Sequence, residues 1–362
     1  MLYSILNNKN WIIIGTKVMN YKNKYDEIFK KVSIANYENF NDEVHKQWDT
    51  LKNQNYSIPK SCQFYDFFSL KKEDLHDRFS VYYNNVLFDC LMTEPSSEKE
   101  KKTLFVIFSG SKNEGDPVPV FKRWSYFPFC DGYVLNIADP MLSIHRQMKL
   151  GWYYGTKNES YIEYVAAIIQ KVQSLLDIEN RNTFLFGSSG GGYVSLHLSY
   201  YLDNTTHIAL NPQISIKDYR YTEGLKRAVG ISSLDAKDEF RRNETVDIIC
   251  ENISSNRFLI IQNMNDGEHC QKQLFPLMKK LNVDSLNFGM NQINSNMLVW
   301  MYDLIGGHSA QGDQLIFSYI IYMAERLASE NFELSDFESF LFKNISCLWK
   351  QREWYKYISD RK

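Results

Sequence analysis

The chain has 362 residues, of which 41 are basic and 43 acidic, and its formal net charge is −2. This near balance gives no electrostatic footprint for nucleic acid or an anionic membrane, and it disfavours polyanion binding as the main function. The length accommodates one large α/β domain with extensions and a full hydrophobic core.

Apolar runs such as residues 104–108 are far shorter than the roughly 20 residues needed to span a bilayer, so we expect no transmembrane segment. The N-terminus lacks a basic region followed by an apolar stretch and a small-residue cleavage site, which argues against a secretory signal and favours a cytoplasmic location. The six cysteines have neither C-x-x-C spacing nor a zinc-type histidine pattern. We therefore expect buried free thiols, no bound metal and no bound cofactor.

Residues 1–77 contain one short strand candidate at 11–15 and amphipathic segments, but no motif that carries chemistry. We interpret them as an N-terminal extension that packs on the main domain or contacts a partner. Two β-rich runs between residues 79 and 92 flank Asn84-Asn85, a pair that tolerates the positive φ of a hairpin turn. The main domain is predicted to begin with this hairpin and to cover residues 78–330.

Residues 103–108 form an apolar strand of the kind found in parallel sheets covered on both faces, and Ser109-Gly110-Ser111 follows at once. Backbone N–H groups near Gly110 and Ser111 are candidates for binding an oxyanion, and a plain connecting loop is an equally good interpretation. The next strand, 132–137, leads through Asp139, which we interpret as a turn residue before proline.

A loop at residues 151–155 is expected to lie along the same sheet edge, with Trp152 or Tyr153 as a wall of the substrate pocket. Apolar residues at helical spacing then predict a helix over residues 161–176. Because this helix leads into another strand, the segment has the strand, helix, strand order of a right-handed crossover.

The motif that organises the chain is Gly187-Ser188-Ser189-Gly190-Gly191, which lies between an apolar strand and a helix-compatible segment. It fits G-x-S-x-G, the pattern of a nucleophile elbow, in which the residues two before and two after the serine have almost no room for a side chain. Ser189 is therefore the predicted nucleophile, and the N–H group of Gly190 is a predicted oxyanion donor. A glycine-rich helix start and an inactive elbow are the alternatives.

Beyond a short strand at 207–212, residues 214–256 form a polar insertion that is too long for a simple loop and suits a cap over the site. We interpret its basic residues as a solvated helical face rather than an anion site. The next buried strand, 257–262, ends close to Asp266, our candidate for the acid that orients a histidine. Glu268 and His269 lie close by, but their spacing is a weak metal signal.

The last strand candidate, 296–303, is followed by Gly306-Gly307-His308, which makes His308 the general-base candidate. His45, His76 and His145 precede the elbow and so break the expected order. An amphipathic helix over 311–327 is predicted to close the sheet. The aromatic-rich residues 331–362 are interpreted as a C-terminal helical extension that packs on the cap or forms an oligomer surface.

Ser189, Asp266 and His308 stand in the order nucleophile, acid, base, each just after a predicted strand. In this, residues 78–328 resemble the α/β-hydrolase superfamily. The resemblance implies a mostly parallel sheet flanked by helices, with a cap, and acyl transfer through an acyl-serine intermediate. The sequence departs from the superfamily in lacking an HGGG-type oxyanion motif, which puts the second oxyanion donor in question.

Several segments, including Phe108-Ser109-Gly110-Ser111 and Asn136-Ile137-Ala138-Asp139-Pro140, also resemble proteins of bacterial surface-polysaccharide loci. Among these are serine-dependent O-acetyltransferases of capsule sugars and the acetyltransferase-like component of the accessory Sec export system. The resemblance implies acetyl-CoA as acyl donor, a carbohydrate hydroxyl as acceptor, and a capsule-assembly partner or a homo-oligomer. A general carboxylesterase, lipase or peptidase, and a non-catalytic assembly protein of the same fold, are the alternatives.

Overall fold

The computed structural model describes residues 11–14, 17–20, 62–95, 102–113, 115–130, 132–235, 237–302, 307–309 and 314–329. The strand predicted near the N-terminus is β1 (Trp11–Ile14), which pairs antiparallel with β2 (Lys17–Asn20). The helical extension predicted at 331–362 lies outside the described residues.

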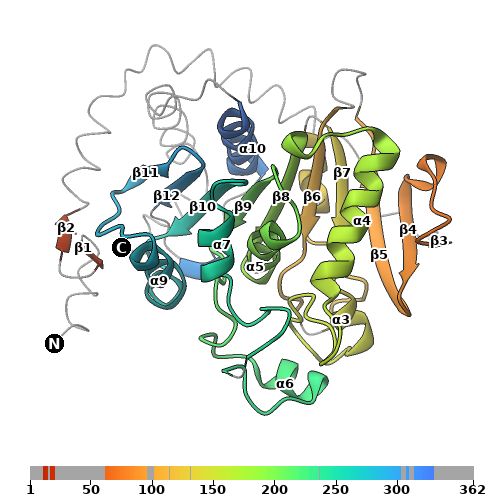
Figure 1. The fold of residues 1–362 in the computed structure, drawn as a ribbon, viewed down its shortest axis with the longest axis horizontal. Helices are drawn as coiled ribbons and strands as arrows, with labels where there is room; N and C mark the ends of the chain where they lie inside the picture. Colours follow the sequence, from red (N-terminus) through yellow and green to blue (C-terminus); the bar gives the residue numbers. More distant parts are fainter. Residues whose placement is uncertain are drawn as a thin grey trace.

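The main architectural element is a ten-stranded sheet with the strand order β11-β12-β10-β9-β8-β6-β7-β5-β4-β3 (Figure 1). Its strands are β3 (Gln63–Asp66), β4 (Asp77–Tyr83), β5 (Val86–Thr93), β6 (Leu104–Phe108), β7 (Tyr133–Ile137), β8 (Thr183–Ser188), β9 (Thr206–Leu210), β10 (Arg257–Asn263), β11 (Gly289–Asn294) and β12 (Met297–Tyr302). The strands from β12 to β7 are mutually parallel, and β4 and β5 form the predicted hairpin. The predicted mostly parallel sheet is thus confirmed.

Side chains of the central strands alternate between two cores. In β6, Val106 points into the core that includes α4 (Tyr161–Leu176), whereas Phe105 points into the core beneath α10 (Gln314–Ala328). All five β6 residues are buried. This explains the unbroken apolar run, because a strand covered on both faces has no polar side.

The other helices lie around the sheet, apart from α6 (Glu223–Val229), which lies away from it (Figure 1). The structure has, in addition, α3 (Pro140–Ile144), α5 (Gly190–His197), α6 (Glu223–Val229), α7 (Val246–Asn252), α8 (Gly267–His269) and α9 (Phe275–Lys280). Helix α4 matches the predicted range, and its start is capped by Ser160, whose hydroxyl accepts a hydrogen bond from the N–H of Glu163. Among the described residues, none of the helices combines the length and hydropathy required to cross a membrane.

The two ends of the insertion between β9 and β10 lie next to each other. Ser215 and Glu244 form an isolated bridge there, and the N–H of Thr245 donates to the carbonyl of Ile214 at 2.8 Å. Helix α6 lies on this insertion, away from the sheet (Figure 1). We call residues 214–245 the cap segment.

One basic residue of the cap segment is buried, contrary to the predicted solvated face. Arg242 is 1% exposed and forms an ion pair with Asp238 at 2.7 Å. Its Nη1 donates to the backbone carbonyls of Tyr154, Thr156 and Glu159 at 2.9, 2.7 and 2.7 Å. The solvated-face interpretation was wrong for Arg242, because a guanidinium offers five donors that can satisfy several carbonyls in the interior. This contact ties the cap segment to the loop at 151–159.

Candidate active site

Ser189 stands at a sharp turn between β8 and α5, with φ 55° and ψ −120°. The turn brings the flanking backbone so close that a Cβ built on Gly187 would lie 2.0 Å from the carbonyl oxygen of Gly191. A Cβ on Gly191 would lie 2.6 Å from the carbonyl oxygen of Phe108. Both positions therefore require glycine, which is the physical content of the G-x-S-x-G pattern.

Replacing Gly187 by alanine is expected to destabilise the protein by more than about 3 kcal/mol, because backbone atoms of the elbow would have to move. The matched control is Gly224→Ala in α6, where an added Cβ meets no atom within 4 Å. That change should be neutral or stabilise by up to about 1 kcal/mol. Urea unfolding of both variants measures the difference, and equal midpoints would contradict the proposed strain.

The structure brings the predicted nucleophile, base and acid into one hydrogen-bonded row. The hydroxyl of Ser189 lies 2.9 Å from Nε2 of His308, and Nδ1 of His308 lies 2.7 Å from Oδ2 of Asp266. Ser189 and Asp266 are buried, while the His308 side chain is 32% exposed. This geometry allows Nδ1–H to donate to the carboxylate, which leaves Nε2 as an acceptor for the serine proton.

A second histidine binds the other oxygen of the same carboxylate. Nδ1 of His269 lies 3.0 Å from Oδ1 of Asp266, and the His269 ring stacks on His308 with centroids 4.1 Å apart and planes 18° apart. Burial of Asp266 opposes its ionisation, but the hydrogen bonds from His269 and His308 outweigh that cost and hold the pKa of Asp266 below its usual range. Asp266 is thus a carboxylate fixed at both oxygens.

Asp266, His269 and His308 have the side-chain types of a metal site, and their ligand atoms lie within 4.8 Å of one another. Ring nitrogens coordinate a metal along lone pairs that lie in the ring plane. The two imidazoles are stacked almost parallel, and each Nδ1 faces a different oxygen of Asp266. The lone pairs therefore run side by side instead of converging on one point, and the arrangement suits proton sharing better than a metal ion.

The serine follows β8, the acid follows β10 and the histidine follows β12, which are neighbouring parts of one parallel sheet. A serine at such an elbow, followed along the chain by the acid and then the histidine, identifies the fold. This is an α/β-hydrolase fold. The sequence itself matches no protein-family model and no curated protein.

Several solved structures are similar to the hydrolase-fold chain at low identity. A capsule O-acetyltransferase of Neisseria meningitidis serogroup A is 19% identical, with 68% of this chain and 96% of that chain covered and a TM-score of 0.48. An S-formylglutathione hydrolase from Agrobacterium tumefaciens is 15% identical, with 70% and 94% covered and a TM-score of 0.49. The Gap123 glycosylation associate protein complex from Streptococcus agalactiae is 16% identical, with 68% and 45% covered and a TM-score of 0.47.

Two of the three predicted oxyanion donors, Gly110 after β6 and Gly190 at the start of α5, lie beside one another. A Cβ on Gly110 would lie 2.9 Å from the carbonyl oxygen of Ser188 and 3.7 Å from the amide nitrogen of Gly190. Gly190 is the first residue of α5, so its N–H has no acceptor within the helix. Ser111 is exposed on the same loop. The position of Gly110 and Gly190 beside Ser189 is compatible with an oxyanion hole, which stays a prediction, as does the role of Ser111.

Hydrogen bonds of Ser109 fix the loop that carries Gly110. The Ser109 hydroxyl donates to the carbonyl of Val120 at 2.7 Å and accepts from the N–H of Lys122 at 3.0 Å. The N–H of Ser109 donates to the hydroxyl of Tyr153 at 3.1 Å. Because three hydrogen bonds fix the Oγ and N atoms of Ser109, the neighbouring Gly110 amide has a defined position.

Trp152 and Tyr153 are both buried, and their predicted role as a wall of the substrate pocket stays a prediction. Tyr153 is fully buried and its hydroxyl donates to the carbonyl of Ile137, while Trp152 is 1% exposed and its indole N–H donates to Gln213. Both residues have a left-handed backbone, with φ 53° and 52°. Tyr153 also accepts a hydrogen bond from the N–H of Ser109, and Gln213, the partner of Trp152, contacts the hydroxyl of Ser189.

Asp139, interpreted from the sequence as a turn residue, is the anchor of this loop. Its carboxylate caps α3 by accepting from the N–H of Met141 at 3.0 Å and also accepts from the N–H of Tyr153 at 3.1 Å. Asp139 is 2% exposed. Burial raises the pKa of Asp139 to about 7, against the lowering effect of backbone hydrogen bonds from Tyr153, Met141 and Gly151.

This pKa predicts a pH-dependent stability. The unfolded chain releases the Asp139 proton near its ordinary pKa of 3.8 and the folded protein near 7, so the folded state binds more protons between these values. The free energy of unfolding should therefore fall as the pH rises from about 4 to about 7, by at most about 4 kcal/mol. Chemical denaturation across this range, compared with Asp139→Asn, measures the contribution. Parallel curves for the two proteins would contradict it.

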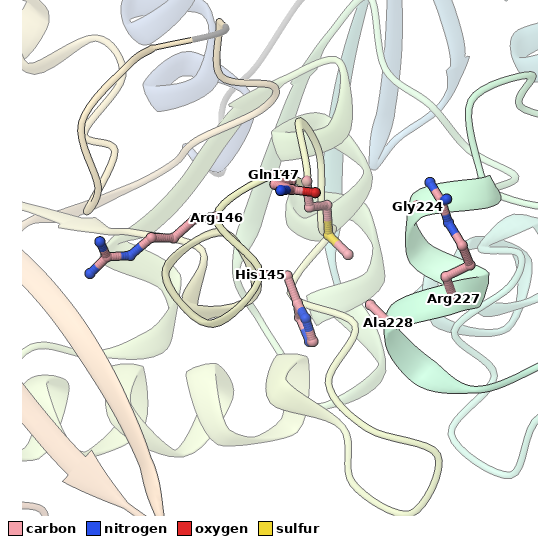
Figure 2. Close-up of a pocket in the computed structure, with 7 residues that line it drawn as sticks. His145, Arg146, Gln147, Gly224, Arg227 and Ala228 are labelled. Atoms are coloured by element: carbon pink, nitrogen blue, oxygen red, sulfur yellow. The ribbon is translucent and has the colours of Figure 1, made fainter.

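A cavity of about 550 Å³ lies where the segment after α3 meets helix α6. Its lining residues are His145, Arg146, Gln147, Met148, Gly224, Arg227 and Ala228. The guanidinium groups of Arg146 and Arg227 extend in different directions in Figure 2, with His145 between them. Basic residues therefore line the cavity, but the two guanidinium groups do not point at a common site where both would bind one anion.

Sequence reasoning missed two residues that contact the Ser–His–Asp row: Gln213, and His269 in its role beside Asp266. Gln213 follows Asn211-Pro212 at the carboxyl end of β9, the sheet edge where Ser189 also lies. A polar residue just after a buried parallel strand was the available signal. His269 was noticed only as a weak metal ligand, because its ring position depends on the turn that α8 makes after Asp266.

Proposed function

We propose that this protein catalyses serine-dependent acyl transfer through an acyl-enzyme. The observation that carries the proposal is the continuous row of hydrogen bonds from Ser189 through His308 to Asp266. A serine hydroxyl is a weak nucleophile at neutral pH, and a neutral imidazole at 2.9 Å can remove its proton as it attacks. Asp266 holds the required tautomer and stabilises the imidazolium that forms.

In the first step, Ser189 Oγ forms a bond to the acyl carbonyl carbon while its proton passes to Nε2 of His308. The tetrahedral oxyanion is stabilised by N–H groups near Gly110, Ser111 and Gly190. The intermediate collapses as the bond to the leaving group breaks, and His308 returns the proton to that group. In the second step an acceptor hydroxyl attacks the acyl-serine, its proton passes to His308, and Ser189 leaves with that proton.

As substrates we propose a sugar hydroxyl of a bacterial surface polysaccharide as acceptor and acetyl-CoA as acyl donor. The support for this finer assignment is the resemblance of the Ser109-Gly110-Ser111 loop, the 136–140 segment and the elbow to O-acetyltransferases of polysaccharide loci. A transferase must admit a sugar and exclude water. The cap segment, residues 214–245, is the candidate for excluding water. A glycan-assembly protein or a second copy is the corresponding partner class.

Incubation of the protein with labelled acetyl-CoA and capsule oligosaccharides tests the transferase assignment. Mass increments of one acetyl group on the sugar are expected, and they should be absent with Ser189→Ala. A protein that instead hydrolyses a simple ester and leaves every oligosaccharide unmodified is a general esterase of the same fold. That result would reject the transferase assignment but would agree with the proposal that the reaction passes through an acyl-enzyme.

A further inference from the structure

The side-chain amide of Gln213 contacts Ser189 at one end and the indole of Trp152 at the other. It is fully buried, and its Nε2 lies 3.3 Å from Oγ of Ser189. Its backbone N–H also donates to the carbonyl of Ser189 at 3.2 Å. At the other end of the amide, Oε1 accepts from Nε1 of Trp152 at 2.5 Å. A hydrogen-bonded row therefore runs from Trp152 through Gln213 to Ser189 and on to His308.

The chemistry of the indole fixes which way the amide faces. The Trp152 N–H can only donate, so the amide oxygen must face Trp152 and the NH₂ group must face Ser189. With Oγ accepting from Gln213, the serine hydrogen is left to point at Nε2 of His308. A reversed amide would present its oxygen to Ser189 and attract the same hydrogen away from the base.

The structure holds Trp152 in place at a cost in backbone conformation. Its φ of 53° lies in the left-handed region, which is unfavourable for a bulky side chain and persists only where the surroundings enforce it. The ring packs edge-on against Tyr219, with centroids 5.9 Å apart. The next residue, Tyr153, is tied to Asp139 through its backbone N–H. The indole position is thus set by several independent contacts.

From this geometry we infer that Gln213 is a further catalytic residue and that Trp152 is a positioning residue acting through it. The inference rests on the proposed acyl transfer at Ser189. Gln213 keeps the Ser189 hydrogen directed at His308 before attack, and it neither gains nor loses a proton. After acylation Oγ is an ester oxygen, and the same N–H donor remains beside it to assist its departure in the second step.

The test measures the second-order rate constant for labelling by a fluorophosphonate, which reports on Ser189 without knowledge of the natural substrate. Gln213→Met keeps the volume and removes the donor, and Trp152→Phe keeps an aromatic ring and removes the N–H. We expect labelling to slow by about 10-fold or more for Gln213→Met and by several-fold for Trp152→Phe. Because Trp152 acts through Gln213, the double variant should match Gln213→Met alone.

The matched control is Trp300→Phe, the same chemical change at a buried tryptophan in the core beneath α10. It should leave the labelling rate unchanged. Equal loss from Trp152→Phe in the presence and absence of Gln213 would overturn the inference, as would wild-type rates for folded Gln213→Met. If that variant does not fold, Gln213→Leu takes its place in the same cycle. A wild-type protein that is not labelled at all would reject the proposed function instead.

Discussion

Replacing Ser189 by alanine is expected to abolish fluorophosphonate labelling and to lower acyl transfer by at least about 10⁴-fold. The reason is that no other hydroxyl stands at the elbow within 2.9 Å of the His308 imidazole in the described part of the chain. The change leaves the backbone turn with its φ of 55° in place, so the fold should be retained, with a cost of at most about 3 kcal/mol because the buried Gln213 amide loses its acceptor.

The matched control is the adjacent serine of the motif. Ser188 accepts a hydrogen bond from Arg123 Nη2 at 3.2 Å and lies at the last position of β8. Ser188→Ala should therefore keep its labelling, with an effect on stability no larger than about 1.5 kcal/mol. Labelling that persists in Ser189→Ala at the wild-type stoichiometry would reject Ser189 as the nucleophile.

Asp266→Asn is expected to lower the rate of acylation by about 10⁴-fold while leaving the fold intact. An asparagine offers one oxygen and one NH₂ group, whereas the two imidazoles of His269 and His308 both donate to the native carboxylate. One histidine must then take the opposite tautomer, and for His308 that tautomer presents a hydrogen to Ser189. Labelling kinetics with an activated ester or a fluorophosphonate measures the loss.

Glu268→Gln is the control for Asp266, since it changes the same charge two residues away. Glu268 forms ion pairs with Arg220 and Lys272, neither of which belongs to the Ser–His–Asp row. Its replacement should leave acylation unchanged. The pKa of Asp266 is held below its usual range, so the carboxylate stays ionised as the pH falls from 7 to 4, and any loss of acylation in that interval must come from other groups.

Much of the sheet could be predicted, because buried parallel strands leave an uninterrupted apolar signal. Strands β6, β8, β10 and β12 all fall on such runs. Strand β11 escaped prediction because it is an edge strand whose residues 291–294 alternate between half-buried and exposed and are mostly polar. Periodicity alone does not separate such a segment from a loop.

The elbow and its partners were predictable for a different reason. The turn at Ser189 demands glycine at two positions through local backbone geometry, and such a demand is visible in any window of five residues. The buried positions of Trp152 and Gln213 are not local. They depend on the Asp139 carboxylate, which fixes the 151–155 loop across the sheet edge, and no pattern in the sequence announces that contact.

The buried guanidinium of Arg242 has a consequence for engineering. Since it satisfies carbonyl groups of Tyr154, Thr156 and Glu159, the insertion and that loop form one mechanical unit. Transplanting a foreign segment in place of residues 214–245 would remove the guanidinium donor from the carbonyls of Tyr154 and Thr156, whereas the carbonyl of Glu159 would keep the N–H of Thr156 as a donor. A chimera that replaces the insertion should therefore exchange residues 151–159 together with residues 214–245, because Arg242 joins the two stretches.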